Sequence, residues 1–355
     1  MGFSISICSL ILVSALLLTS EIKVGVADKT FSVLDYVAVG NGITDDSSAF
    51  TKAWNDACNT DGEDKWLTFN SVNGLNISGL GSFDAYGASW WNNSCSLSPK
   101  PTLTINYCND ISLQHLYFKN SPQMHLVVSG SSNVYLRSLD IYAPEWSPNT
   151  DGIHIGGSHG VVVRASTIGT GRASLSSDSD DCISITDQTS NITISDIKCG
   201  PGHGISIGSL GQDGSEVSVS KIKVKNVNFH GSTNGARIKT WQVGRGQVSQ
   251  VDFSNLNFTA VENPIIIDQY YCNTPGNCPK TNTVVHIDDV HFRNAFGTSS
   301  TEVAINLKCS DNVACTNIIL DTIKLESAIQ GKETISSCNN AFETTEGIVK
   351  PKSCL

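Results

Sequence analysis

The feature that most constrains the fold is a short β-branched motif that recurs along the chain. Its copies are "NDISL", "SNVYL", "HGVVV", "SNITI", "SEVSV", "SQVDF", "TVVHI" and "TNIIL". If each copy is anchored on its first inward apolar residue, the anchors are Ile111, Val134, Val161, Ile192, Val217, Val251, Val285 and Ile318. These anchors are separated by 23, 27, 31, 25, 34, 34 and 33 residues. Repetition at such a period indicates a solenoid, in which each repeat packs on its neighbours.

Further apolar runs follow the anchors. A second run, such as "LQHLYF" or "LRSLDIY", is followed by a third that closes the repeat, and the third runs are "HLVVSG", "GIHIGG", "CISITD", "GISIGS", "GARIKT", "PIIIDQ" and "VAINLK". Three short strands separated by Gly, Asn and Ser turns predict one coil of an all-β, single-stranded parallel β-helix. A β-sandwich also has short, regularly spaced strands, but it does not usually repeat one three-strand motif in order. Helical periodicity is confined to residues 45–58, where Asp45 or Asp46 would cap a helix across one end.

The start of the chain predicts secretion. Residues 1–27 contain the apolar run "LILVSALLL" and end in "VGVA", a small-x-small pattern typical of signal-peptide cleavage. We therefore expect a signal peptide over residues 1–27 and a single extracellular domain over residues 28–355, although a buried N-terminal segment is an alternative because early Lys or Arg residues are missing. Neither this run nor any later one is long enough to span a bilayer.

The acidic balance limits the partners. A formal net charge of -10 argues against nucleic acid or an anionic membrane surface as a partner. An acidic substrate stays possible, since a local pair of basic side chains can hold a carboxylate on an otherwise acidic surface.

Cysteines and sequons fit a secretory route. The later cysteines form near neighbours along the chain, and one set of pairings is Cys95 with Cys108, Cys182 with Cys199, Cys272 with Cys278, Cys309 with Cys315, and Cys338 with Cys354. Spacing alone does not fix connectivity, and Cys58 is left over. Sequons occur at Asn76, Asn92, Asn191 and Asn257.

Polar residues collect around the third runs. Successive coils of a β-helix lie about 4.8 Å apart, so equivalent positions form a column. The segments "NTDGIHI", "DSDDCISI", "GPGHGISI" and "GARIKTW" place in that column Asp151, then Asp180 and Asp181, then His203, then Arg237 and Lys239. Because Arg237 and Lys239 flank Ile238, we expect both to face solvent.

The chemistry of this column suits the hydrolysis of an acidic sugar. Neighbouring carboxylates repel one another, so one keeps its proton and serves as general acid while the others deprotonate a water. Room for that water implies the separation of about 6.5 to 9.5 Å found in inverting glycosidases. Arg237 and Lys239 suit a uronate carboxylate, and His203 would hold a carboxylate or a sugar hydroxyl.

Each residue also has a simpler interpretation. An isolated Asp before a strand is usually a turn former, and an Arg and a Lys two residues apart usually form a solvated face. A Ca²⁺ or Zn²⁺ site is a further alternative, but the spacings match no known ligand pattern, so we expect no metal and no cofactor. Alignment across four consecutive coils favours a site, because independent turn residues have no reason to align.

The segments "NTDGIHI", "DDCISI", "GHGISIGSLG" and "RIKTW", in this order, resemble the signature segments of the polygalacturonases, above all those of plants. The likeness covers nearly all of the mature chain, including "VLDYVAVGNGITDDSSAF" and the pair Trp90 and Trp91. It implies a right-handed parallel β-helix and inverting hydrolysis of the α-1,4-galacturonosyl linkages of pectin in the cell wall. Endo or exo action depends on whether the loops leave the groove open at both ends, and of the two we favour endo. Its partner would be polygalacturonate, and we expect a monomer.

The same resemblance implies roles by position. Asp180 would be the general acid, Asp151 and Asp181 would activate the water, and His203 would support them. The substrate-binding residues would be Arg237, Lys239, Tyr271 and Asn149.

Three departures from the family pattern put activity in question. The family joins "GTG" directly to "DDC", whereas residues 172–179, "RASLSSDS", intervene here, and 31 minus these eight residues gives the 23 of the first coil. The region near residues 58–66 looks shortened, which would remove the partner of Cys58. Ala85 and Thr186 replace usual glycines, so we expect strained turns there. The alternatives to a hydrolase are a pectin-binding wall protein with impaired catalysis and a Ca²⁺-dependent pectate lyase.

Overall fold

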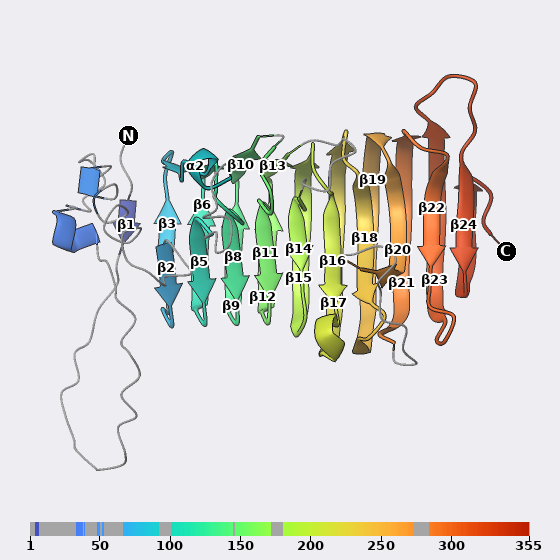
Figure 1. Ribbon diagram of the computed structural model, residues 1–355, viewed down its shortest axis with the longest axis horizontal. Helices are drawn as coiled ribbons and strands as arrows, with labels where there is room; N and C mark the ends of the chain where they lie inside the picture. The colour runs from blue at the N-terminus through green and yellow to red at the C-terminus, as the bar shows by residue number, and fades with distance from the viewer. Residues whose placement is uncertain are drawn as a thin grey trace, which may run out of the picture.

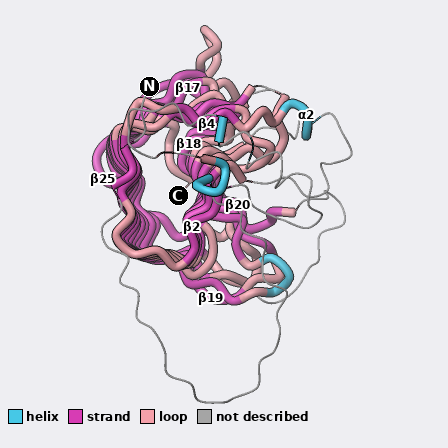
Figure 2. Tube along the Cα trace, turned by 90° about the vertical axis from the view of Figure 1, so that its left-hand side faces the viewer, coloured by secondary structure: helices cyan, strands magenta, loops and turns pink. Residues whose placement is uncertain are grey.

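The computed structural model describes residues 4–6, 33–37, 39, 48–49, 52, 67–91, 101–144, 146–171, 180–272 and 284–354. Over these residues the chain winds into a right-handed parallel β-helix, which Figure 1 shows from the side and Figure 2 along its axis. The coils follow the sequence from the N-terminal to the C-terminal end (Figure 1). The short helical turns whose bounds lie within the described residues are η1 (Val33–Tyr36), α2 (Ala88–Trp91) and η3 (Gln212–Gly214). No described helix has the length and apolar character needed to cross a membrane.

One sheet takes a single strand from each coil. Its ten strands, all paired in parallel, are β2 (Leu67–Asn70), β5 (Leu103–Asn106), β8 (Leu126–Ser129), β11 (Ile153–Gly156), β14 (Ile183–Ile185), β16 (Ile205–Leu210), β18 (Asn234–Trp241), β20 (Asn263–Tyr271), β22 (Val303–Lys308) and β24 (Ile335–Asn339). Within this sheet, the seven strands from β8 to β22 correspond to the seven third runs, so each third strand predicted from the sequence is confirmed.

The remaining strands form a fifteen-stranded sheet that wraps around the other sides. Its main path is β1 (Ser4–Ser6), β3 (Asn76–Ser78), β6 (Asn109–Gln114), β9 (Ser132–Arg137), β12 (His159–Arg164), β15 (Thr189–Cys199), β17 (Glu216–His230), β19 (Arg245–Val261), β21 (His286–Ser299), β23 (Cys315–Ser327) and β25 (Ala341–Lys350). A side branch holds β4 (Ser82–Asp84), β7 (Tyr117–Lys119), β10 (Asp140–Ala143) and β13 (Thr167–Thr170). The first and second runs are thus separate strands in the early coils and merge into one long strand from β15 onward. The β1–β3 pair is antiparallel, unlike the rest.

The register corrects two predicted anchors. Ile111, Val134, Val161 and Ile192 pair in succession, as predicted. The column then continues through Ile222, Val251, Val290 and Ile318, so Val217 and Val285 are wrong. Val217 misleads because β17 is long and its buried residues alternate from its start, so the first apolar residue is not the one that stacks on Ile192.

The corrected anchors also change the argument about coil length. The interval of 31 residues from Val161 to Ile192 is confirmed by their pairing. The later intervals, however, become 30, 29, 39 and 28 residues, from the register of the paired anchors. A coil of 31 residues is ordinary among these, so coil length does not by itself identify residues 172–179 as additional.

Side chains at equivalent positions stack inside and outside the coils. In the core, Phe253 stacks on Phe292 with ring centroids 5.4 Å apart, and full burial of such a ring stabilises the fold by about 1.5 to 3 kcal/mol. At the outer bend, Asp196, Asn226 and Asn255 adopt left-handed backbone conformations, which Asn and Asp tolerate. Their side chains form a ladder, since Asn226 Nδ2 donates to Asp196 Oδ1 at 2.9 Å and Asn255 Nδ2 donates to Asn226 Oδ1 at 3.0 Å.

Three of the five predicted neighbour pairings are confirmed, and the pairing of Cys108 is wrong. The structure contains the bonds Cys182–Cys199, Cys309–Cys315 and Cys338–Cys354. Cys272 is also disulfide-bonded, while its predicted partner Cys278 lies outside the described residues, as do Cys58 and Cys95. Cys108 is a free buried thiol, so its predicted bond to Cys95 is wrong. Its Sγ lies inside the coil, 3.2 Å from the Phe69 carbonyl oxygen, to which it donates.

Two other expectations concern the turns at Ala85 and Thr186 and the helix over residues 45–58. Neither Ala85 nor Thr186 has a positive φ, so the strain predicted at these positions, where the family pattern has glycine, is wrong. Of the helix predicted over residues 45–58, Ser48, Ala49 and Lys52 are helical, and its other residues lie outside the described part of the chain. The region of residues 58–66 and the segment 172–179 lie outside it too.

Candidate active site

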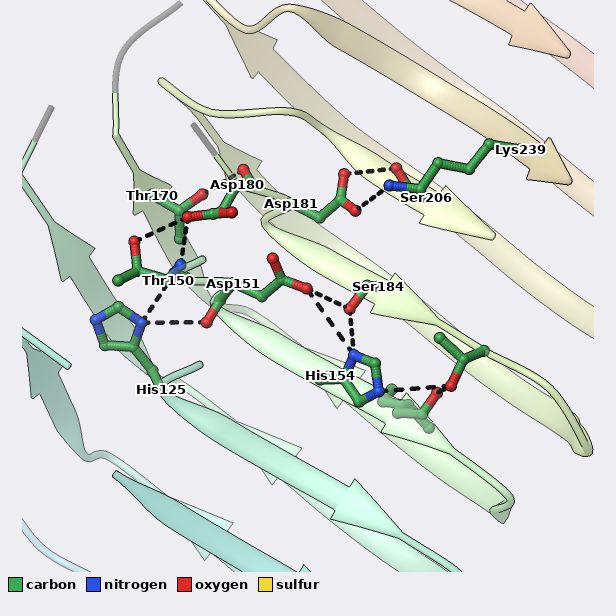
Figure 3. Close-up of polar contacts among 12 residues, drawn as sticks. His125, Thr150, Asp151, His154, Thr170, Asp180, Asp181, Ser184, Ser206 and Lys239 are labelled. Carbon is green, nitrogen blue, oxygen red and sulfur yellow. Dashed lines mark hydrogen bonds and ion pairs between the residues drawn. The ribbon is translucent and has the colours of Figure 1, made fainter. Parts of the chain in front are cut away.

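The predicted column lies along one edge of the ten-stranded sheet, where the third strands begin (Figure 3). Strands β11, β14 and β16 are in register through Ile153, Ile183 and Ile205. Asp151, Asp181 and His203 each stand two residues before these positions and therefore occupy equivalent places in three consecutive coils. The structure thus brings together the carboxylates and the imidazole that the sequence places in one column.

Asp180 carries the proton at neutral pH. Its Oδ2 accepts hydrogen bonds from the backbone N–H of Thr150 and from the Thr150 hydroxyl, the latter at 3.1 Å (Figure 3). The residue is only 8% exposed. Burial and the nearby charge of Asp151 raise the pKa of Asp180 to about 8, although the two bonds from Thr150 oppose this shift. A buried, protonated carboxyl group is equipped to donate a proton.

Asp151 is held in the opposite state. Burial acts to raise its pKa, but hydrogen bonding and charge from His154, the Ser184 hydroxyl and the charge of Lys239 outweigh burial and hold the pKa of Asp151 below its ordinary value. The Ser184 hydroxyl donates to Asp151 Oδ2 at 2.7 Å, and His154 Nδ1 lies 3.9 Å from the same oxygen. Asp151 is therefore ionised where Asp180 is not.

Asp181 is paired on both oxygens. The Ser206 hydroxyl donates to Oδ1 at 2.6 Å, and Lys239 Nζ donates to Oδ2 at 3.1 Å (Figure 3). Both partners of this ion pair are buried, with Asp181 at 4% and Lys239 at 8% exposure. The expectation that Lys239 faces solvent is wrong. Its side chain leaves the core as predicted, but Asp181 and the ring of Tyr271, 5.3 Å from Nζ, cover it.

Arg237 lies beside Lys239 on the same face of β18 and is half-buried. Its Nε is buried and, among the described residues, has no hydrogen-bond partner. A buried guanidinium nitrogen without a partner is costly, so the position favours an acceptor supplied by a ligand. Tyr271, at the end of β20, packs edge-on against Trp241 with ring centroids 5.5 Å apart. Asn149 is exposed in the turn just before Thr150, with φ 52°.

His203 is a neutral imidazole at the pH of most extracellular fluids. Burial, together with the charges of Arg237 and Lys239, lowers the pKa of His203 to about 4, although Asp181 opposes this shift. Its backbone N–H donates to the Asp180 carbonyl oxygen at 2.6 Å, which ties the turns of two adjacent coils together. A neutral ring can donate one hydrogen bond to a hydroxyl or carboxylate.

The Asp180 backbone is also fixed by Thr170, which precedes residues 172–179 in the chain. Its N–H donates to the Thr170 carbonyl oxygen at 3.2 Å, and the Thr170 hydroxyl donates to the Asp180 carbonyl oxygen at 2.8 Å. With the bond from His203, the Asp180 backbone is held by its own coil and by the next one. Its place in the column therefore depends on Thr170 and His203.

Several residues of the site escaped the sequence analysis, namely Ser184, Ser206, His154, Thr150, Thr170 and His125. Ser184 and Ser206 were detectable, because they occupy the outward positions of predicted strands, as Arg237 does. Thr150 holds Asp180 through its backbone N–H and its hydroxyl, and the His125 side chain contacts backbone carbonyl oxygens, so neither leaves a sequence pattern. The buried imidazole of His125 has Nδ1 3.2 Å from the Thr150 carbonyl oxygen and 3.1 Å from that of Asp151, so it braces the turn that holds Asp180 (Figure 3).

The site combines the protonated carboxyl group of Asp180, the ionised carboxylate of Asp151, the Lys239-paired carboxyl group of Asp181, a neutral imidazole and two basic side chains. That set can protonate a leaving group, deprotonate a water and bind an anionic substrate. Among the described residues, the group with metal-ligand spacing is Cys338, Glu343 and Cys354, far along the chain, and its two cysteines are joined in a disulfide. Fold and site together define a carbohydrate-cleaving hydrolase built on a parallel β-helix.

Comparison with known proteins gives the family. The model for "Glycosyl hydrolases family 28" matches residues 18–353, and the chain belongs to this family of glycoside hydrolases. It is 36% identical to a polygalacturonase of Malus domestica, over 91% of this chain and 79% of the relative, and 38% identical to one of Persea americana, over 89% and 78%. The solved polygalacturonase from Erwinia carotovora ssp. carotovora superposes with a TM-score of 0.67 at 27% identity, covering 81% of this chain and 75% of that one. The resemblance seen in the sequence is confirmed.

Proposed function

We propose that the protein is an inverting polygalacturonase that hydrolyses the α-1,4-galacturonosyl linkages of pectin. The observation that carries this proposal is the contrast within one column, where Asp180 has a pKa of about 8 while that of the adjacent Asp151 lies below its ordinary value. Glycosidases need a proton donor and a base at one pH, and this contrast supplies both. The relatives named polygalacturonase support the choice of substrate.

In this mechanism Asp180 gives its proton to the glycosidic oxygen as the bond to C1 breaks. Asp151 and Asp181 hold a water on the opposite face of the sugar and take one of its protons, while the hydroxide oxygen bonds to C1. Attack from the face opposite the leaving group inverts the anomeric configuration. His203, neutral at this pH, donates a hydrogen bond to a substrate hydroxyl.

The substrate carboxylate is bound by the cations of β18. Arg237 provides a forked donor whose Nε has no protein partner among the described residues, and Lys239 adds charge beside it. Tyr271 and Asn149 contact the neighbouring parts of the sugar chain. A neutral sugar would leave Arg237 without an anionic partner, which favours a uronate.

The test is Asp180→Asn in the mature chain, with reducing ends released from polygalacturonate as the measurement. The change removes the donated proton and keeps the shape, so we expect a loss in kcat of about 10²- to 10⁴-fold. Asp213→Asn is the matched control, because Asp213 is exposed in η3 and, like Asn, tolerates its left-handed φ of 56°. Proton NMR of the first product should show the inverted anomer; an unchanged rate removes Asp180 from the role of general acid.

The same assay separates the other candidates. Retained binding of polygalacturonate without release of reducing ends would indicate a pectin-binding wall protein. A product that absorbs ultraviolet light and is lost on chelation would indicate a lyase. The bonds from Thr170 and His203 to the Asp180 backbone support catalysis over the binding-only alternative.

We further propose endo action and secretion to the cell wall. The ten-stranded sheet extends beyond the site in both directions, with β2, β5 and β8 on one side and β20, β22 and β24 on the other, which suits a long chain bound across the site. Products of mixed length early in digestion would support endo action, and galacturonate alone would contradict it. N-terminal sequencing of secreted protein tests the signal peptide of residues 1–27.

A further inference from the structure

A polar cleft lies on the ten-stranded sheet beyond the site. It has a volume of about 370 Å³ and is lined by Tyr270, Asn306, Lys308, Asp311, Ser337, Cys338 and Asn339. The register of β18, β20, β22 and β24 aligns Lys239 with Asp268, Lys308 and Asn339. The cleft therefore continues the same outer face, two strands beyond Lys239.

This cleft repeats a pairing found in the site. Lys239 Nζ lies 5.3 Å from the centroid of the Tyr271 ring, and Lys308 Nζ lies 5.2 Å from that of Tyr270. The two lysines differ in their partners, because Lys239 is bound to Asp181, whereas no described ion pair includes Lys308. Lys308 is exposed, so its ammonium group is available to a carboxylate from solution.

The remaining side chains of the cleft are fixed by one another. Tyr270 Oη accepts a hydrogen bond from the Asp311 N–H at 3.0 Å. Asn339 Nδ2 donates to Asp311 Oδ1 at 3.0 Å and to the Cys309 carbonyl oxygen at 2.7 Å. The Cys309–Cys315 disulfide closes the loop that carries Asp311. Preorganised aromatic, amide and carboxylate groups of this kind suit the ring and hydroxyls of a sugar.

We propose that this cleft is a distal subsite for the polysaccharide, in which Lys308 binds the carboxylate of a galacturonate residue and Tyr270 packs against its ring. The inference rests on the proposed function, since it takes the substrate from there. Two coil spacings, about 9.6 Å, separate Lys308 from Lys239. A 1,4-linked pyranose advances a chain by roughly one such spacing, so the distal residue is about two sugars from the one at Lys239.

The experiment compares Lys308→Gln with wild type on oligogalacturonates of increasing length. For hexagalacturonate we expect kcat/KM to fall roughly fivefold through a higher KM, as for loss of an exposed ion pair, with digalacturonate binding unchanged. Lys308→Arg should restore the affinity. Methyl-esterified hexamers should not distinguish Lys308→Gln from wild type, because they offer no carboxylate. Lys223→Gln, an exposed lysine of β17 on the other sheet, is the matched control.

Binding in the Asp180→Asn background, measured by calorimetry, separates this inference from the hydrolase proposal. If Asp180→Asn and Asp180→Asn/Lys308→Gln bind hexagalacturonate with equal affinity, the subsite proposal is wrong, even if the wild type releases reducing ends. Lys308-dependent binding without such release keeps the subsite and overturns the hydrolase. The subsite proposal is also wrong if Lys308→Gln has a defect of equal size on digalacturonate and hexagalacturonate, or on esterified and free hexamers. Such a defect would reflect a structural effect of the substitution.

Discussion

At the scale of single residues, identical carboxyl groups differ because their hydrogen-bond donors differ. Asp180 is bonded through one oxygen to Thr150, whereas both oxygens of Asp181 have a partner, one of them the ammonium group of Lys239. The donors to Asp180 carry no charge, so burial and the nearby charge of Asp151 outweigh them. The sequence could predict that these aspartates meet, but not which one keeps its proton.

Thr150→Val tests this account. The Thr150 hydroxyl bond to Asp180 Oδ2 favours the ionised carboxylate, and the change removes this bond. The bond from the Thr150 backbone N–H stays in place. The pKa of Asp180 should rise further, by about 0.5 to 1 unit, and the basic limb of the pH profile of kcat should move upward with it. Rates measured from pH 6 to 10 give the limb. A limb that stays in place while kcat falls would contradict this assignment.

The same pKa shift predicts how stability depends on pH. Because Asp180 titrates at about 8 in the folded chain and at 3.8 ordinarily, the folded chain holds a proton between these values that the unfolded chain releases. Its contribution to the free energy of unfolding is complete below pH 3.8 and is lost as pH rises through 8. Asp180→Asn should therefore gain stability relative to wild type as pH rises from 4 to 8. Urea denaturation of both proteins across this range is the measurement, and parallel curves would contradict the shift.

At the scale of elements, the third strands are predictable because their alternation of apolar and polar residues is short and regular. The long strands are not, since β17 contains several equivalent apolar pairs and only stacking on β15 selects Ile222 as the partner of Ile192. Close approach between turns is likewise decided by packing. If Gly204, whose φ is +85°, carried a Cβ, that atom would lie 2.1 Å from the Asn234 carbonyl oxygen. The turn after His203 therefore needs a glycine to approach the next coil this closely.

Deletion of residues 172–179 is the test at this scale. The bonds of Thr170 and His203 to Asp180 join groups outside the segment, so they should re-form after the deletion. We expect kcat on polygalacturonate and the basic pH limb to match wild type. Loss of kcat in a variant with an unchanged urea midpoint would show that the segment itself positions Asp180.

At the scale of the whole molecule, stability is distributed from coil to coil, as in other solenoids. The repeats made the architecture predictable from the sequence, because each coil must bury its apolar face on the next. Burial of Lys239 was not predictable, since it depends on Asp181 and Tyr271 reaching across coils from residues distant in sequence. The pairing of Cys108 failed for a similar reason, as neighbours along the chain need not face one another.

Removal of two disulfides should show how local this stability is. The Cys182–Cys199 bond closes 17 residues in the coil of Asp181, and the Cys309–Cys315 bond closes 6. Replacing both cysteines by Ala should lower the free energy of unfolding by about 3 kcal/mol for the first pair and about 2 kcal/mol for the second. Urea denaturation gives both values. We expect kcat to fall only for the first pair; an equal effect of both pairs on kcat would contradict local coupling.

The buried free thiol of Cys108 can report how often the early coils open. Its sulfur is enclosed between the Phe69 carbonyl oxygen and the Val72 N–H, and the residue is 2% exposed. A thiol reagent can modify this sulfur only after β2 and β5 separate, so its labelling rate measures how often that end of the molecule opens. Because coils contact only their neighbours, labelling at Cys108 followed by mass spectrometry would record breathing of the N-terminal end while catalysis continues several coils away.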